Sequence, residues 1–197
     1  MPDDESTATR NSKRCSLTGV KIQIMRRLIS LVAGAGLLAL CATAFAQTQT
    51  YDDKAGGYTL ELPSPTWRAI ARPDSEHEHT EFVYGDRSDG YLRIRKEVVD
   101  AGTTPSDVSH RDHDLKLRFF SGYVEGKEKE ENFVGRLKGV TSSYEYTAAG
   151  HPMLGRIYYL QADSRTIYVL HFTGARDKLM LIRSQTDAIA RSFQLKQ

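Results

Sequence analysis

Two short runs near the carboxyl end of the chain are apolar on both of their alternating faces. Residues 157–160 read Ile-Tyr-Tyr-Leu and residues 167–170 read Ile-Tyr-Val-Leu, with a tight turn at residues 163–165 between them. A strand with one face in water alternates apolar and polar residues, whereas a strand covered on both faces is apolar throughout. The pattern therefore predicts an antiparallel hairpin over residues 156–162 and 166–173, in a central sheet covered on both sides.

Shorter strands are predicted from alternation and from breaker residues. Residues 58–62 read Tyr-Thr-Leu-Glu-Leu, a half-buried alternation that ends at Pro63 because proline cannot donate to a strand ladder. Trp67 begins a second short strand. Further strands are predicted at residues 81–84, 91–99, 133–137 and 140–147. The segments expected to lie outside strands are a polar lead-in at 47–57, a charged loop at 72–80 and a solvated charge run at 125–131.

The middle of the chain predicts an amphipathic helix that ends at Gly122. Thr104 is a good N-cap, Pro105 suits the first helical position, and Asp107 completes an approximate capping box. Three apolar residues fall on one stripe of this helix and are expected to face the core: Val108, Leu115 and Phe119.

A second helix is predicted from about Asp177 to the end of the domain. Its apolar residues recur at helical spacing: Leu179, Ile182, Ile189, Ala190 and Phe193. The order of strands, helix, strand meander and helix predicts an α+β fold with a mostly antiparallel sheet and helices on its faces.

A secretory signal is predicted at residues 25–46, after a polar tail at residues 1–24. It has a Met-Arg-Arg start, an apolar run at residues 28–40 and an Ala-Phe-Ala site at residues 44–46. Because the signal is complete from Met25, that residue is an alternative start of the chain.

We expect cleavage between Ala46 and Gln47, which releases the domain into the periplasm or the medium. The alternative is an uncleaved anchor, since residues 28–46 are barely long enough to cross a bilayer. In either case, a single domain at residues 58–197 works outside the cytoplasm and does not itself span the membrane.

Removal of the leader changes the charge and removes both thiols. The full chain has a net charge of +2, but residues 47–197 hold 21 basic and 22 acidic side chains, so no basic stripe remains. Nucleic acid is therefore not expected as a partner. Cys15 and Cys41 both precede the cleavage site, so the exported domain has no disulfide, cysteine nucleophile or cysteine metal site.

The two ends of the domain resemble PsbP-like and DcrB-like domains. Residues 57–63 (Gly-Tyr-Thr-Leu-Glu-Leu-Pro), followed by Trp67, resemble their opening, in which an aromatic-led strand ends in proline and a tryptophan follows. Residues 187–193 (Asp-Ala-Ile-Ala-Arg-Ser-Phe) resemble their "I-x-x-S-F" ending, and the meander at 158–172 matches their middle. The resemblance spans about residues 58–193.

This resemblance implies an α/β/α sandwich around an antiparallel sheet. It implies that Tyr58, Trp67 and Phe193 are markers of the fold, with Trp67 and Phe193 in the core. Members of this superfamily are mainly non-catalytic accessory or binding proteins, so the resemblance supplies no catalytic residue for this chain.

The sequence His77-Glu78-His79 is the most suggestive local pattern for a ligand. Residues two apart in an extended chain point the same way, so His77, His79 and Glu81 are candidate ligands for zinc, copper or nickel. The alternative is a solvated loop, because a preformed site needs rigidity and supporting contacts that this segment does not predict. We expect no structural metal and no cofactor.

Other polar groups have a structural and a functional interpretation. Asp107, His110 and Asp114 share one helix face, with His113 beside it, and form either a metal or acid–base cluster or the solvated side of the helix. The solvated side is our prediction. His171 alternates with apolar residues in a central strand and is predicted to be a buried, hydrogen-bonded structural histidine, whereas His151 has no obvious partner.

The function predicted from these observations is that of an exported, non-catalytic protein that binds a protein partner in the cell envelope. No serine elbow, phosphate loop or metalloprotease helix occurs in the sequence. The alternative function is binding of a metal by the His77 segment, or of a small molecule in a tyrosine-lined pocket. The tyrosines considered for that pocket, which could equally be packing residues, are Tyr144, Tyr146, Tyr158 and Tyr159.

Overall fold

The computed structural model describes residues 48–73, 78–133 and 137–196. The predicted tail, the leader with its cleavage site, both cysteines and His77 lie outside these residues. Among the described residues, no helix is both long and apolar enough to cross a membrane.

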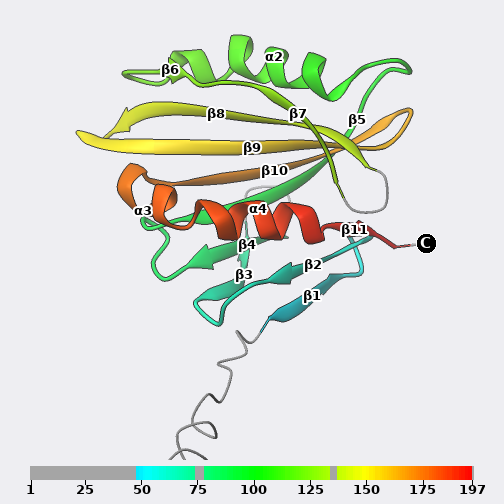
Figure 1. The fold of residues 1–197 in the computed structure, drawn as a ribbon, viewed down its shortest axis with the longest axis horizontal. Helices are drawn as coiled ribbons and strands as arrows, with labels where there is room; N and C mark the ends of the chain where they lie inside the picture. Colours follow the sequence, from blue (N-terminus) through cyan, green and yellow to red (C-terminus); the bar gives the residue numbers. More distant parts are fainter. Residues whose placement is uncertain (1–47, 74–77, 134–136, 197) are drawn as a thin grey trace, which may run out of the picture. The chain divides into compact units, whose positions relative to one another are not determined.

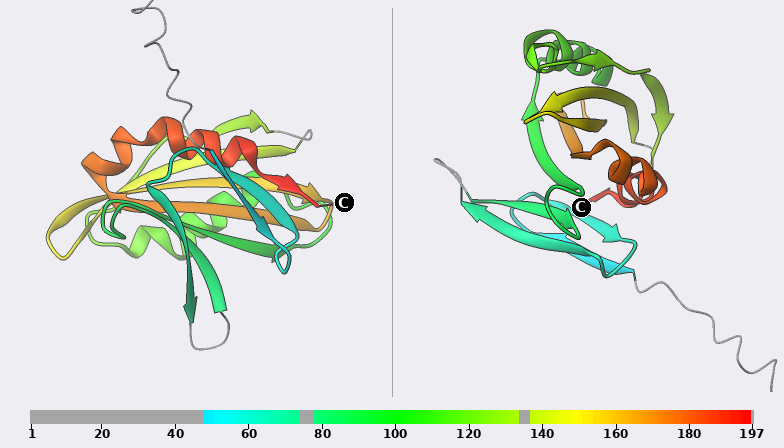
Figure 2. Two further views of the ribbon diagram at one scale, coloured as in Figure 1. Left: turned by 90° about the horizontal axis from the view of Figure 1, so that it is seen from below. Right: turned by 90° about the vertical axis from the view of Figure 1, so that its left-hand side faces the viewer.

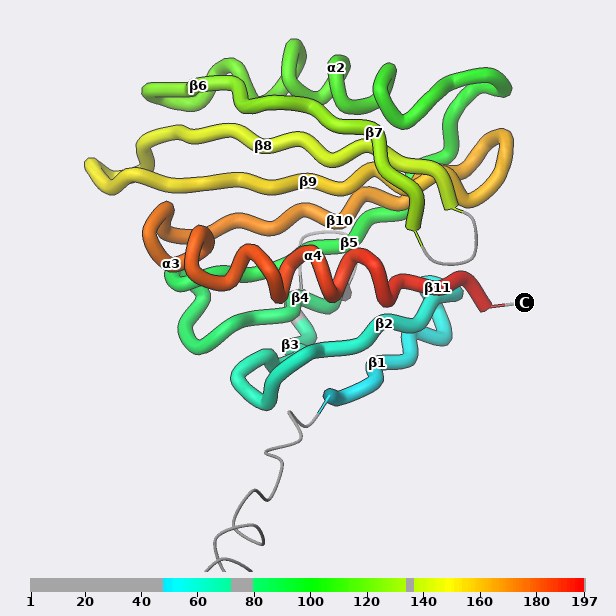
Figure 3. The backbone as a smooth tube through the Cα atoms, in the orientation of Figure 1, coloured from blue at the N-terminus to red at the C-terminus, as the bar shows by residue number. Residues whose placement is uncertain are grey.

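An antiparallel sheet, with eight strands in the described chain, forms the centre of the domain (Figures 1 and 3). Its strands are β3 (Trp67–Pro73), β4 (Glu78–Tyr84), β5 (Tyr91–Val98), β6 (Val124–Glu125), β7 (Lys129–Asn132), β8 (Lys138–Ala148), β9 (His151–Asp163) and β10 (Thr166–Ala175). Their order is β3-β4-β5-β10-β9-β8-β6, and β7 also pairs with β8. The predicted central hairpin is confirmed, because β9 and β10 pair along nearly their whole length.

A smaller sheet joins the two ends of the described domain. β1 (Gln49–Asp53) pairs with one edge of β2 (Tyr58–Leu62), and β11 (Gln194–Leu195) pairs with the other. The backbone N–H of Glu61 donates to the Ser192 hydroxyl at 2.9 Å, and the Lys196 N–H donates to the Gly57 carbonyl at 3.0 Å. The first and last described segments therefore lie side by side (Figure 2).

Helices cover both faces of the large sheet. The helix α2 (Pro105–Leu115) and the 3₁₀ turn η1 (Leu117–Phe119) lie on one face, and α3 (Arg176–Leu181) and α4 (Arg183–Ser192) lie on the other (Figures 1 and 2). One core cluster joins the strands to α3, α4 and the small sheet, and a second joins them to α2 and η1. Successive residues of β9, such as Ile157 and Tyr158, belong to different clusters. The predicted α/β/α sandwich is confirmed.

The three marker residues lie in the larger core cluster. Tyr58, Trp67 and Phe193 are each at most 4% exposed. The rings of Tyr58 and Phe193 stack with centroids 5.2 Å apart, and the Trp67 indole N–H donates to Gln185 Oε1 at 2.9 Å. Their prediction as core residues is confirmed.

The predicted helix that ends at Gly122 is shorter in the structure, where α2 ends at Leu115 and η1 follows it. Four strand and loop segments also differ from the prediction. The polar lead-in contains β1, and the charge run contains β7, because edge strands can present charged side chains to water while their backbones pair. The predicted strand at 133–137 is wrong at Phe133 and Leu137, which both lie outside strands. The Phe133 N–H donates to the Leu137 carbonyl at 2.8 Å, between the end of β7 and the start of β8. β3 and β4 extend into the predicted loop at 72–80.

The carboxyl-terminal helix is broken into α3 and α4 at Ile182. Its predicted core residues are nonetheless all buried: Leu179, Ile182, Ile189, Ala190 and Phe193.

Candidate functional site: the α2 surface and the polar layer beneath it

The helix α2 begins at the predicted capping box. The Asp107 backbone N–H donates to the Thr104 hydroxyl at 3.2 Å, and the Thr104 N–H donates to the Asp107 carboxylate at 2.8 Å. These contacts satisfy two amide donors that the first turn of a helix leaves free. The start of α2 is therefore fixed as predicted, with Pro105 in the first turn.

The buried face of α2 differs from the predicted one. Leu115 is 66% exposed and Phe119 is 74% exposed, so the predicted apolar stripe is wrong beyond Val108. The helix instead buries four residues, three of them polar: Val108, Ser109, Asp112 and His113. Burying a charged or strongly polar group is costly unless it is paired or hydrogen-bonded, and Asp112 and His113 are both engaged in a network beneath the helix.

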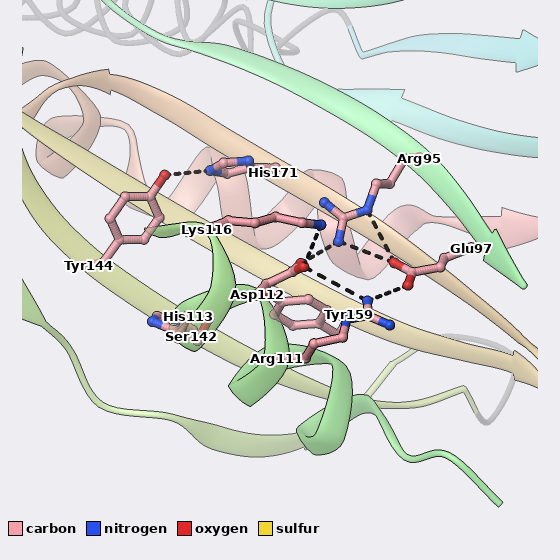
Figure 4. A network of polar contacts seen from close by, with 10 residues as sticks. All are labelled: Arg95, Glu97, Arg111, Asp112, His113, Lys116, Ser142, Tyr144, Tyr159 and His171. Atoms are coloured by element: carbon pink, nitrogen blue, oxygen red, sulfur yellow. Dashed lines mark hydrogen bonds and ion pairs between the residues drawn. The ribbon is translucent and has the colours of Figure 1, made fainter. Parts of the chain in front are cut away.

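Asp112 is the centre of this network (Figure 4). Its carboxylate is only 3% exposed and forms ion pairs with Arg95 of β5 and with Lys116, whose Nζ lies 2.8 Å away. The Tyr159 hydroxyl lies 3.4 Å from the same carboxylate. Burial opposes the charge of Asp112, but Lys116 and Arg95 outweigh it and hold the pKa of this carboxyl below its usual value.

Glu97 connects a second arginine to this network (Figure 4). It pairs with Arg95, at 3.2 Å from Nη2, and with Arg111 of α2. The ion pairs thus join two residues of α2 to two residues of β5, so the orientation of the helix is set by specific contacts as well as by Val108.

His113 contacts two hydroxyl groups from different elements. Its Nδ1 forms a hydrogen bond with the Tyr123 hydroxyl, and its Nε2 lies 3.2 Å from the Ser142 hydroxyl of β8. These contacts fasten the carboxyl-terminal half of α2 to β8 and to the segment that follows η1.

His171 occupies the same face of the sheet, on β10. Its Nε2 lies 2.8 Å from the Tyr144 hydroxyl and 3.2 Å from the Thr173 hydroxyl. Burial, followed by the positive charge of Arg95, lowers the pKa of His171 to about 4. The imidazole is therefore neutral near pH 7, and its Nε2 is engaged by these two hydroxyl groups. The prediction of a hydrogen-bonded structural histidine is confirmed, although the side chain is only partly buried.

Four exposed apolar side chains lie within ten residues at the carboxyl end of α2, where η1 leads into β6 (Figure 1). Phe120 is 41% exposed and packs on Tyr146, with ring centroids 4.9 Å apart. Val124 is 60% exposed and lies opposite Glu145 on the edge of the sheet. We call this group, Leu115, Phe119, Phe120 and Val124, the outer apolar surface.

The helix residues considered as a metal or acid–base cluster face solvent. Asp107, His110 and Asp114 are all exposed, which confirms the solvated interpretation of that face. His110 lies 3.8 Å from Glu128, and His151 is exposed at the start of β9. Across the described ranges, no group of three or more His, Cys, Asp or Glu side chains is placed to hold a metal ion.

The candidate ligands of the His77 segment are only partly described. The backbone of His79 pairs with Arg72 in the β3–β4 ladder. Glu81 is 3% exposed, and its carboxylate accepts hydrogen bonds from Arg87 at 2.9 and 3.1 Å. Arg93 lies 3.6 Å from it. A metal would compete with these cations for Glu81, and the proposed site at His77, His79 and Glu81 stays a prediction.

The four tyrosines considered for a ligand pocket do not form one wall. Tyr144 and Tyr159 lie in the core cluster under α2, whereas Tyr158 lies in the cluster on the opposite face of the sheet. Each of these three is at most 1% exposed. Tyr146 stacks on Tyr144, with centroids 5.6 Å apart. Three of the four tyrosines are thus packing residues, which was the alternative interpretation of the sequence.

The antiparallel sheet with helices on both faces is the PsbP-like fold. Three solved structures share it. LpqN of Mycobacterium tuberculosis, described as involved in cell envelope biogenesis, is 14% identical over 77% of this chain and 92% of its own, with a TM-score of 0.55. Cyanobacterial PsbP from Synechocystis is 15% identical over 78% of this chain and 95% of its own, with a TM-score of 0.54.

The third structure is the Ran-binding protein Mog1p of Saccharomyces cerevisiae. It is 10% identical over 76% of this chain and 96% of its own, with a TM-score of 0.54. These likenesses confirm the predicted resemblance at the level of the fold. Comparison with protein-family models and with curated sequences found no match.

Proposed function

We propose that this chain is an exported accessory protein of the cell envelope, which acts by binding another protein and catalyses no reaction of its own. The observation that carries the proposal is the orientation of α2. This helix buries Asp112 and His113 while it exposes Leu115, with Phe119 exposed in the turn that follows.

A surface helix normally turns its apolar residues to the core, whereas α2 buries Val108 but leaves Leu115 exposed. Rotating α2 to bury Leu115 would separate Asp112 from Arg95, and an unpaired buried charge is strongly destabilising. The polar layer therefore keeps the outer apolar surface in water. A partner that covers this surface gains roughly 25 cal/mol for each Å² of apolar area buried, and exposed aromatic anchors are typical of binding hot spots.

The fold neighbours and the leader support the same proposal. LpqN is described as a protein of cell envelope biogenesis, and Mog1p as a Ran-binding protein. Neither description assigns a reaction. The signal at residues 25–46 supports export.

The hydrogen-bonded histidines, His113 and His171, also support a binding role. The Nε2 of His171 forms a hydrogen bond with the Tyr144 hydroxyl, and both ring nitrogens of His113 contact hydroxyl groups of the surrounding structure. A general base needs a nitrogen within reach of a substrate proton. In this structure the Nε2 of His171 and both ring nitrogens of His113 are instead engaged by hydroxyl groups of the protein.

The test is capture followed by direct binding. A photo-crosslinking amino acid in place of Phe119 identifies a candidate partner in envelope extract, and the affinity of that purified partner is then measured. We expect Leu115→Ser/Phe119→Ser to weaken binding by about tenfold or more. The matched control is Val98→Ser/Leu181→Ser, which removes two side chains of similar exposure (74% and 79%) elsewhere. Equal loss in both variants, or loss in neither, would contradict the proposal.

A further inference from the structure

A groove lies on the face of the large sheet opposite α2. Its floor is formed by Thr141 and Ser143 of β8 and Arg156 of β9, and its volume is about 620 Å³. One wall is α4, and the other is the segment at residues 127–131 that includes β7. Figure 3 shows β8 and β9 between these two walls. The groove contains no residue of the outer apolar surface, and it shares only Ser142 with the contacts beneath α2.

The lining of this groove is rich in cations. It contains three carboxylates, Glu128, Glu131 and Asp187, and five cationic side chains, which are Lys127, Lys129, Arg156, Arg183 and Arg191. The groove therefore carries two more positive than negative charges.

The carboxylates of the groove are already engaged by neighbours. Asp187 pairs with Arg156 at 2.6 Å, and Glu131 pairs with Arg191 at 2.7 Å and with Lys129 at 3.1 Å. Neither Lys127 nor Arg183 makes an ion pair with a carboxylate of the described residues. Both are exposed at the mouth of the groove, and they are the cations available to an anion from outside.

Thr141 provides a second, independent indication of a ligand. It is 6% exposed, lines the groove, and its hydroxyl has no hydrogen-bond partner among the described residues. Leaving a buried hydroxyl unpaired carries a free-energy penalty, and an acceptor at the groove floor would remove it. Because the oxygen is covered, such an acceptor must displace a side chain above it.

The groove continues into a more apolar cavity of about 350 Å³. Ser143, Arg156 and Arg183 line both spaces, and the second is also lined by Leu154 of β9 and by Leu179 and Met180 of α3. The carboxylate in the lining of the second space, Glu145 of β8, is paired with Arg176 at 3.3 Å. Met180 is 58% exposed. The combined groove thus has a cationic end beside β7 and an apolar end beside α3.

We propose that this groove binds an anionic amphiphile, with a phosphate-type head at the cationic end and an alkyl chain at the apolar end. The excess of two positive charges matches a phosphate monoester. Lys127 and Arg183 would contact the head, Thr141 would donate to one of its oxygens, and Leu154 and Met180 would contact the chain. This site does not depend on the proposed partner of the outer apolar surface.

The experiment is calorimetric titration of the full-length protein with three probes: dodecyl phosphate below its micelle concentration, inorganic phosphate, and dodecyl maltoside. We expect dodecyl phosphate to bind best, because it alone engages both ends of the groove. Inorganic phosphate should bind more weakly, through the cations alone. Inorganic phosphate that binds as tightly as dodecyl phosphate, or maltoside that binds equally well, would overturn the proposal.

Variants test which residues carry the binding. Lys127→Ala/Arg183→Ala should weaken dodecyl phosphate binding by about tenfold, while Lys54→Ala/Arg165→Ala, which removes two other exposed cations, should leave it unchanged. Thr141→Val should weaken binding without destabilising the fold, because its hydroxyl has no hydrogen-bond partner among the described residues. Equal affinity of the Lys127/Arg183 variant and the wild type would overturn the proposal.

Discussion

The hydroxyl of Tyr144 on β8 lies 2.8 Å from Nε2 of His171 on β10, although β9 runs between their strands. The ring of Tyr144 reaches across β9 at Gly155, its direct partner in the ladder. A Cβ atom on Gly155 would lie 2.1 Å from the Tyr144 ring. The contact between β8 and β10 therefore depends on glycine at position 155 of β9, where any side chain would clash with the Tyr144 ring.

Gly155→Ala should destabilise the domain by about 2–3 kcal/mol, because overpacking displaces a buried ring. Urea unfolding measures this loss. In a double-mutant cycle, Tyr144→Ala should relieve part of it, so the two losses should be less than additive. Strict additivity would show that the ring does not cover Gly155.

The domain should lose stability between about pH 6.5 and pH 4 because of His171. In the unfolded chain the imidazole takes up a proton below its ordinary pKa of 6.5, whereas in the folded domain burial lowers the pKa to about 4. The unfolded state binds more protons in this window, so stability falls as the pH is lowered, by about 3 kcal/mol in total. Urea unfolding of His171→Gln across this range should show a smaller decline, and an equal decline would contradict the assignment.

Asp112→Ala should cost about 1.5–3 kcal/mol, since it removes the buried carboxylate that Arg95 and Lys116 contact, and these two cations are themselves 40% and 57% exposed. Asp114→Ala, two residues further along the same helix, is the control. Asp114 is 71% exposed, so its loss should change stability by less than about 0.5 kcal/mol. Similar effects of the two substitutions would show that the network beneath α2 is not stabilising.

Trp67→Ala and Phe193→Ala should each destabilise the domain by about 3–5 kcal/mol, the usual cost of truncating a large buried aromatic residue. Both side chains are at most 1% exposed in the larger core cluster. Chemical unfolding of each variant decides the point, and a loss below about 1 kcal/mol would be incompatible with this packing.

Export should remove the leader between Ala46 and Gln47, because Ala-Phe-Ala at residues 44–46 presents small residues at the positions read by signal peptidase. Amino-terminal sequencing of the protein recovered from the envelope or medium should therefore begin at Gln47. A start at Met25 or Cys41 would contradict the prediction.

Most of the sheet could be predicted from the sequence, because its strands carry strong local signals. The doubly apolar runs of β9 and β10, the alternation of β2 and the capping box of α2 each depend on residues close together in the chain. The edge strands β1 and β7 were missed because their residues are mostly polar and their pairing depends on distant partners.

The polar layer under α2 was missed for a related reason. Apolar periodicity assigned Leu115 to the core, whereas Asp112 is buried because Arg95 lies seventeen residues earlier on β5. One signal was available: Asp112 follows the buried Val108 by one helical turn and so shares its face. Nothing local in the sequence identifies Arg95 as its partner.

The pairing of β2 with β11 has a consequence for when the domain can fold. The contact between Glu61 and Ser192 spans 131 residues, and β11 lies two residues beyond it. Because β2 acquires this second partner only after β11 has been synthesised, the nascent chain cannot close its smaller sheet until the whole of the larger sheet has been translated. Such long-range closure slows folding. For a chain that is exported as proposed, this delay keeps the polypeptide unfolded for longer, in the form that can still thread through a narrow translocation channel.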